Sequence, residues 1–265
     1  MIIDTLLIGV IFVLTAVITH LAVGVGFYVG KRIRRKDDTE QDAPAAAIAA
    51  AILGVLSFML AFIFGIVTDR FDDKKELVRQ EANAIRTVWE RSEFLQEPDR
   101  TKTFGLLRKY VDARLAFAQA GDPTNFEPKL AEARSLHHQM WEIAIANART
   151  DPFMFSDIGS LYIDSINQLS ALGALRVNRG LQARLPSGMW FALYCLLMLG
   201  MFAIGYQTAI NDPRPSRATL ILAVSFSVVL ALIAALDHPM NSFIAIPQTP
   251  MVSLQTEMNG NSASQ

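Results

Sequence analysis

The sequence predicts an all-α membrane protein in which four transmembrane helices carry a four-helix extramembrane domain, inserted between spans 2 and 3. Hydrophobic residues make up 52% of the 265 positions and charged residues only 18%, which is apolar for a soluble domain of this size. Four apolar runs are long enough to cross a hydrocarbon core of about 30 Å, at about 1.5 Å per residue. A long, charge-balanced amphipathic stretch separates the second run from the third.

The first two spans and the basic loop between them occupy residues 1–68. The first apolar run, about 6–29, ends abruptly at a cluster of lysine and arginine in the loop at 31–44. The second run begins after Pro44, whose fixed φ angle suits the first turn of a helix. It closes at about residue 67, just before charged residues begin, so its apolar length also predicts a transmembrane helix.

The stretch at 69–185 is predicted to be a helical extramembrane domain. It contains no alternating run rich in valine, isoleucine and threonine, and its apolar residues recur at helical spacing. We expect the second span to continue as the first domain helix, followed by three more helices, at about 99–121, 127–147 and 157–184.

A transmembrane hairpin is predicted at 186–236. Its two spans, about 189–209 and 218–236, are separated by a short segment rich in helix breakers. The remaining residues, 237–265, contain three prolines and end in small polar residues, so we expect a tail that is extended and then disordered.

The charge pattern predicts an orientation. The two short loops are rich in lysine and arginine, whereas the tail contains neither, and the positive-inside rule gives short loops the greatest weight. This places the helical domain and the tail outside the cytoplasm. The flanks of the domain also carry arginine and lysine near the membrane, so the opposite orientation stays open.

Several classes of function find no support in the sequence. The net charge of -1 provides no basic surplus for nucleic acid, and the single cysteine excludes a disulfide framework. His137, His138 and Glu142 lack the further ligands that a zinc site needs, and no phosphate loop or nucleophile elbow occurs. We therefore predict no enzyme, no catalytic residue, no metal and no cofactor, and the lipid bilayer is the expected partner.

One row of residues on the second span is a candidate pore lining. Gly54, Phe58, Phe62 and Ile66 recur at every fourth position, so they share one face of a helix. Large apolar side chains arranged in this way are typical of a narrow constriction that closes by dewetting. The alternative is that the row faces lipid or another helix.

Four charged residues are candidates for a vestibule or for anchoring the domain. Asp69 and Arg70 lie where the second span leaves the bilayer, and they fit either an ion-selecting vestibule or an interfacial helix with local ion pairs. Glu81 lies near an apolar seam, and we expect it to pair with a domain arginine and fix the bundle. Asp237 ends the fourth span, where its carboxylate can cap amides of the following turn.

Small residues in the first span predict close helix packing. Gly26 and Gly30 are separated by three residues, and this spacing lets two helix backbones approach each other in a membrane. The sequence leaves open whether the glycines join helices of one bundle or of two protomers.

Two motifs resemble the bestrophin-like family of bacterial membrane proteins, over about 51–254. The first is the segment 60–85, which includes Asp69-Arg70-Phe71-Asp72-Asp73-Lys74-Lys75-Glu76. The second follows the last span and reads Ala235-Leu236-Asp237-His238-Pro239, then Phe243-Ile244-Ala245-Ile246-Pro247. Bestrophins are anion channels built as pentamers around a central pore.

The resemblance implies a subunit of a homo-oligomeric channel for chloride or other small anions, in the bacterial inner membrane. Bestrophins keep their helical domain in the cytoplasm, so the resemblance and the charge pattern predict opposite orientations. The calcium-binding acidic cluster of animal bestrophins is missing, since only Asp237 and Glu257 are acidic after the last span. The alternative function is a membrane-anchored interaction or sensory module without transport.

Overall fold

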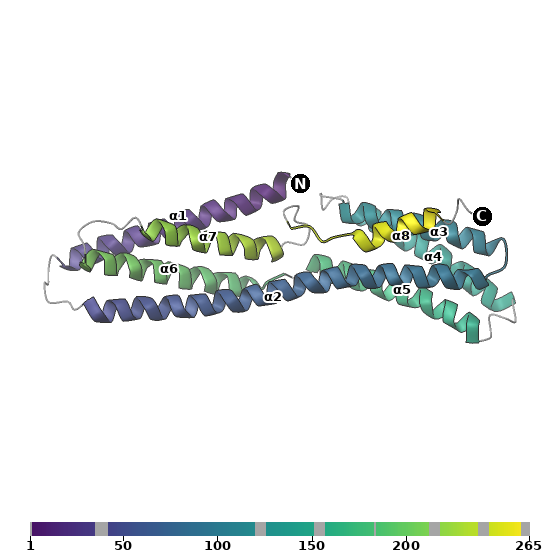
Figure 1. The fold of residues 1–265 in the computed structure, drawn as a ribbon, viewed down its shortest axis with the longest axis horizontal. Helices are drawn as coiled ribbons and strands as arrows, with labels where there is room; N and C mark the ends of the chain where they lie inside the picture. The colour runs from purple at the N-terminus through teal and green to yellow at the C-terminus, as the bar shows by residue number, and fades with distance from the viewer. Residues whose placement is uncertain are drawn as a thin grey trace. The chain divides into compact units, whose positions relative to one another are not determined.

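The computed structural model describes residues 2–34, 42–119, 126–150, 157–182, 184–211, 218–237 and 244–260. All regular elements within these ranges are helices, which confirms the all-α class (Figure 1). They are α1 (Ile2–Arg34), α2 (Asp42–Arg91), the short 3-10 helix η1 (Ser92–Phe94), α3 (Asp99–Gln119), α4 (Phe126–Thr150), α5 (Asp157–Gln182), α6 (Ser187–Asn211), α7 (Ala218–Asp237) and α8 (Thr249–Gly260).

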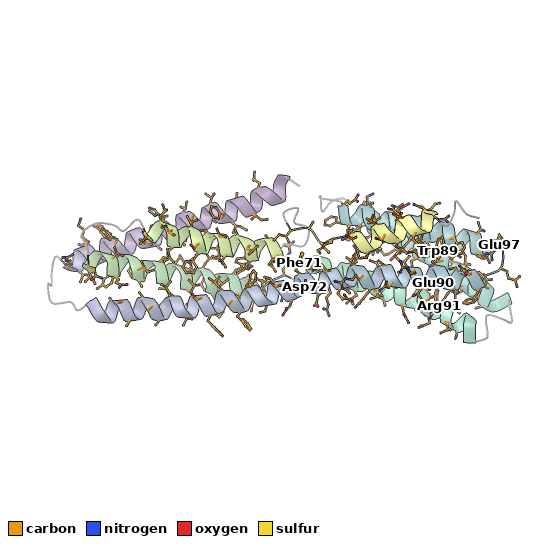
Figure 2. The ribbon with its side chains drawn as sticks, in the orientation of Figure 1. Phe71, Asp72, Trp89, Glu90, Arg91 and Glu97 are labelled. Carbon is orange, nitrogen blue, oxygen red and sulfur yellow. The ribbon has the colours of Figure 1, made fainter. Side chains whose placement is uncertain are left out.

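The chain divides into two compact units. The first unit comprises Met1–Phe71 and Arg184–Ile244, and the second comprises Asp72–Ala183 and Ala245–Gln265. Helix α2 contributes to both, and its division falls between Phe71 and Asp72, which are labelled in Figure 2. We expected the divisions a few residues away, after residues 68 and 185.

The first unit contains four helices that are long and apolar enough to cross a membrane, namely α1, the first part of α2, α6 and α7. Its core is apolar: Leu56, Leu60 and Ile63 of α2 are buried in one cluster with Leu193 and Leu197 of α6. Large apolar side chains also cover its outer faces. Contact between these apolar side chains and water would be unfavourable, whereas contact with lipid would not, so the surface is suited to a bilayer.

Helices α1 and α6 pack in direct backbone contact. A Cβ atom added to Gly26 would lie 2.1 Å from the carbonyl oxygen of Phe202, and one added to Gly205 would lie 2.1 Å from that of Val23. A Cβ atom on Gly30 would lie 2.7 Å from the carbonyl oxygen of Tyr206. The glycines of the first span therefore join two helices of the same chain.

The second unit contains the end of α2, η1, α3, α4, α5 and α8. Its core draws on all of the helices, with Ile85, Leu107, Met140 and Ile166 fully buried in a single cluster. Trp89 of α2, labelled in Figure 2, stacks on Phe104 of α3 with ring centroids 4.1 Å apart. Four of these helices were expected from the sequence, and α8 was not.

The expectation of an extended and then disordered tail is wrong for residues 249–260, which form α8. Met251, Leu254 and Met258 recur at helical spacing and are buried in the core of the second unit. Pro250 stands in the first turn, where its missing amide hydrogen costs the helix nothing. The other tail residues for which disorder was expected, 261–265, lie outside the described residues.

Polar contacts also attach α8 to the second unit. The Arg86 Nη2 atom lies 2.6 Å from Glu257 Oε2, and Gln255 Nε2 donates to Asp112 Oδ1 at 2.6 Å. Arg108 Nε donates to the carbonyl oxygen of Met258 at 3.2 Å. Helix α8 is therefore held by its apolar face and by its polar edges.

Candidate functional site

The candidate pore row lies on the outer face of α2 in the first unit. Phe58 is 70% exposed and Phe62 is 54% exposed, so the helices that the structure describes leave most of both rings uncovered. Gly54 is exposed and has open space around it, whereas Ile66 is half-buried against the core. The row is therefore free to face either lipid or a second copy of the chain.

Asp69 and Arg70 follow this row on α2. Asp69 is exposed, and Arg70 is half-buried. The Arg70 Nη1 atom is buried and has no hydrogen-bond partner among the residues that the structure describes. Arg70 therefore brings a positive charge to this end of the row, and no ion pair among the described residues neutralises it.

Asp237 connects the end of α7 to the segment that precedes α6. Its Oδ1 atom accepts a hydrogen bond from the backbone amide of Leu185 at 2.8 Å. We expected this carboxylate to cap amides of the following turn, but residues 238–243 lie outside the described part of the chain. The contact found instead ties together the two ends of the hairpin formed by α6 and α7.

Replacing Asp237 by alanine is expected to lower the free energy of unfolding by about 1.5–3 kcal/mol, because it removes an acceptor that bonds a backbone amide through a charged group. Asp237→Asn keeps an acceptor of the same shape and should recover most of the loss. Thermal unfolding of the purified protein in detergent measures both variants. An alanine variant as stable as the wild type would show that this hydrogen bond contributes nothing.

The second unit contains a buried ion cluster around Glu81, which is 0% exposed. Its Oε1 atom lies 2.6 Å from Arg114 Nε of α3, and its Oε2 atom accepts from Arg114 Nη2 at 3.0 Å. Arg176 Nη1 of α5 lies 2.5 Å from the same Oε2 atom. One carboxylate thus joins three helices, α2, α3 and α5.

The electrostatics of the cluster favour the charged forms of Glu81 and Arg114. Burial alone would raise the pKa of Glu81, but the charges and hydrogen bonds of Arg114 and Arg176 outweigh it and hold the pKa below its usual range. Burial opposes the charge of Arg114 as well, yet the attraction of Glu81 raises the pKa of Arg114. The cluster therefore carries two positive charges against one negative charge.

Neutral groups complete the cluster. Tyr110 of α3 donates its hydroxyl to Glu81 Oε1 at 3.2 Å, and burial together with the nearby Glu81 charge raises the pKa of this hydroxyl. Arg176 Nη2 donates to Gln248 Oε1 at 2.7 Å. A Cβ atom on Gly173 would lie 3.1 Å from the Tyr110 oxygen, so the lack of a side chain there leaves room for Tyr110.

The sequence predicts an arginine partner for Glu81 but does not indicate which one, nor the contacts of Tyr110 and Gln248. A signal for the arginines was present. Arg176 follows Leu169 and Leu172 on the apolar seam of α5, and Arg114 lies between Val111 and Leu115 on that of α3. A charged residue on an apolar face needs a buried partner of opposite charge.

The metal-ligand candidates on α4 are engaged in other ways. His137 Nε2 donates to the carbonyl oxygen of Ile166 at 3.1 Å. His138 and Glu142 are exposed, with Nε2 3.4 Å from Oε1. Among the described residues, no group of three or more histidine, cysteine, aspartate or glutamate side chains is arranged to hold a metal ion.

Four apolar helices in one unit and a polar helical unit joined to them define a multi-pass helical membrane protein. Residues 13–251 match the model of the Bestrophin-like domain. The chain belongs to this family, and the resemblance found in the sequence is confirmed. No curated protein matches the chain.

Solved structures show the same fold. Two are variants of a bacterial bestrophin homologue from Klebsiella pneumoniae. One is 13% identical over 95% of this chain and 99% of its own, with a TM-score of 0.62. The other is 12% identical over 94% and 97%, with a TM-score of 0.65. A third crystal structure, of a membrane protein, is 11% identical over 95% and 97%, with a TM-score of 0.64.

Proposed function

We propose that the chain is a subunit of a homo-oligomeric channel for chloride or other small anions in the bacterial inner membrane. The observation that carries this proposal is the exposed row on α2. Phe58 and Phe62 are uncovered, although the opposite face of the same helix is buried in the core of the first unit. Membership of the Bestrophin-like family supports the same function.

The row has the properties of a hydrophobic constriction. If copies of the chain surround an axis with this face of α2 inward, each level of the pore is lined by a ring of identical side chains. Rings of phenylalanine narrow the pore and repel water, which closes a channel without any charged gate. Gly54 leaves the pore wider at its own level, and Ile66 narrows it on the other side of the phenylalanines.

Arg70 provides the anion preference in this proposal. It follows Ile66 by one helical turn, and its Nη1 atom has no partner among the described residues. A positive charge near the end of a narrow apolar path raises the local concentration of anions and repels cations. Asp69 and Arg70 then form the charged vestibule, while Glu81 and its arginines anchor the helices of the second unit.

The second unit is the extramembrane domain in this proposal, inserted between the second and third spans. Its surface is rich in charged side chains that are expensive to place in lipid. The basic loops between the spans favour a domain on the side away from the cytoplasm. A reporter fused to Gln265 tests this orientation, because a cytoplasmic tail contradicts it.

Chloride flux into liposomes containing the purified protein tests the pore. We expect the wild type to pass chloride, and Phe58→Ala and Phe62→Ala to raise the flux several-fold, because each removes a ring from the constriction. Phe191→Ala is the matched control. Phe191 is 73% exposed on α6 and lies outside the row, so its loss should leave the flux unchanged.

Two outcomes contradict the proposal. Well-folded protein that passes no ion would favour a membrane-anchored interaction module. Flux that responds equally to Phe58→Ala and Phe191→Ala would mean that the row does not line the pore.

A further inference from the structure

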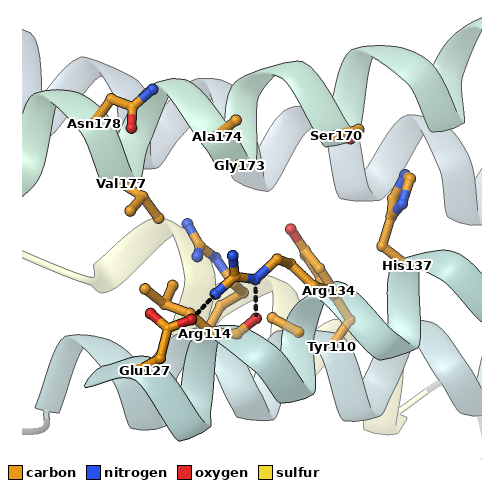
Figure 3. A pocket seen from close by; sticks show the side chains of 12 residues that line it. Tyr110, Arg114, Glu127, Arg134, His137, Ser170, Gly173, Ala174, Val177 and Asn178 are labelled. Atoms are coloured by element: carbon orange, nitrogen blue, oxygen red, sulfur yellow. Dashed lines mark hydrogen bonds and ion pairs between the residues drawn. The ribbon is translucent and has the colours of Figure 1, made fainter. Parts of the chain in front are cut away.

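The second unit contains a cavity that the proposed pore does not use. It has a volume of about 360 Å³ and lies between α3, α4 and α5. Figure 3 shows it between Arg114, Arg134 and Tyr110 on one side and Gly173, Ala174 and Val177 of α5 on the other. A cavity of this size falls in the range that small-molecule sites occupy.

The cavity and the adjoining Glu81 cluster have an excess of positive charge. At the rim, Arg134 forms an ion pair with Glu127, and this pair is neutral. At the inner side, Arg114 lines the cavity and shares Glu81 with Arg176. The pair at the rim is exposed, whereas Arg114 and Arg176 are buried and share one glutamate, so one positive charge of the buried cluster lacks a counterion among these residues. An anion in the cavity would compensate it.

The other walls favour a ligand with an apolar body. Leu130 and Ala133 of α4 and Ala174 and Val177 of α5 also line the cavity. A small inorganic anion would leave these walls uncovered, whereas an aromatic or branched carboxylic acid would cover them and still present a negative charge to the arginines.

Two polar side chains of α5 add hydrogen-bonding groups to the lining. Ser170 and Asn178 of α5 also line the cavity and are exposed. Gly173 stands between them, and the absence of a side chain there keeps the cavity open next to Tyr110. Apolar walls with a few polar groups that fix orientation are typical of sites for small organic ligands.

We propose that this cavity binds a small organic monocarboxylate, with the carboxylate toward Arg114 and Arg134 and the apolar body between α4 and α5. The site is separate from the proposed pore row, and its occupancy is measured without any transport assay.

Isothermal titration calorimetry of the full-length protein in detergent tests this site, with sodium benzoate as the probe. We expect saturable binding of benzoate. Benzyl alcohol has the same ring but no charge, and it should bind about tenfold more weakly or worse because it lacks a charge-assisted hydrogen bond to arginine. Sodium chloride, titrated at the same ionic strength, should not reproduce the benzoate signal.

Two variants on α5 locate the site. Ala174→Leu fills the cavity without changing charge, and we expect it to weaken benzoate binding at least about tenfold. Ala171→Leu adds the same group to an exposed position outside the lining, so it should bind like the wild type. Thermal unfolding verifies that both fold. If Ala174→Leu is unstable, Ser170→Leu fills another part of the cavity and replaces it.

The inference is overturned if benzoate shows no saturable binding, or if benzyl alcohol or sodium chloride matches it. If the wild type and a stable cavity-filling variant bind benzoate with equal affinity, benzoate binds elsewhere, and the inference is overturned as well.

Discussion

Replacing Glu81 by glutamine is expected to lower the free energy of unfolding of the second unit by about 3–5 kcal/mol, because two buried arginines lose their only shared counterion. The side chain keeps its shape, so the loss reports charge and not packing. Arg114 is 2% exposed and cannot turn to water without opening the contacts between α2, α3 and α5. Chemical unfolding followed by circular dichroism in detergent measures the change.

Glu76→Gln is the matched control for this substitution. Glu76 lies on the same helix and pairs with Arg79 at 3.1 Å, but both side chains are about half exposed. An exposed pair of this kind contributes about 0–1 kcal/mol. Equal losses in the two variants would contradict the role given to burial.

A double variant, Glu81→Gln with Arg176→Gln, should be less destabilised than the single variant Glu81→Gln, because fewer buried charges remain unpaired.

The Glu81 cluster also makes stability depend on pH. Its pKa is lowered in the folded protein from the usual 4.5, so the unfolded chain takes up this proton first as pH falls. The contribution of Glu81 is complete above that usual value and is lost as pH falls through the lowered folded value. The difference in stability between the wild type and Glu81→Gln should therefore be constant near neutral pH and shrink in acid. A difference that stays constant down to the lowest pH measured would contradict this assignment.

Adding a single methyl group at Gly26 is expected to disrupt the first unit. A Cβ atom there would lie 2.1 Å from the Phe202 carbonyl oxygen, a backbone atom that cannot rotate away, so α1 and α6 must separate. Overpacking usually costs about 1–3 kcal/mol, and a clash with backbone belongs at or above the upper end of that range. Thermal unfolding in detergent should show a clearly lower transition for Gly26→Ala.

The same helix provides the control. Gly24 is exposed, and a Cβ atom on it would meet nothing within 4 Å. Gly24→Ala should therefore keep the stability of the wild type or raise it by up to about 1 kcal/mol, because alanine is the better helix former. Gly205→Ala tests the contact from the α6 side and should resemble Gly26→Ala. If Gly26→Ala and Gly24→Ala unfold alike, the close crossing of α1 and α6 is incorrect.

The four apolar helices were predictable because each depends on a local property of the chain. An apolar run of sufficient length is visible in the sequence itself, and the structure has helices at all four places. Helix α8 was missed because Pro247 and Pro250 indicate a break when the residues around them are considered alone. The spacing of Met251, Leu254 and Met258 was also present, but only the surface that buries them explains why this short segment is helical.

The Glu81 cluster was predictable only in part. A carboxylate near an apolar seam requires a partner, and this requirement is visible from the neighbouring residues in the sequence. Its partners are 33 and 95 residues away in sequence, and the packing of the domain helices selects them from the other arginines. For the phenylalanine row, the sequence indicated a shared face and the structure adds that this face is uncovered. Whether lipid or another subunit contacts this face depends on molecules other than this chain.

The second unit is discontinuous, since its core needs Met251 and Leu254 of α8 as well as the helices before residue 183. A ribosome makes Met251 and Leu254 after both helices of the α6 and α7 hairpin. The apolar surface that receives α8 therefore stays open throughout synthesis of the hairpin, although domains usually complete their folding in order from the N-terminus. The second unit can therefore be completed only after the hairpin has been made, and a chain that terminates before α8 lacks part of this core.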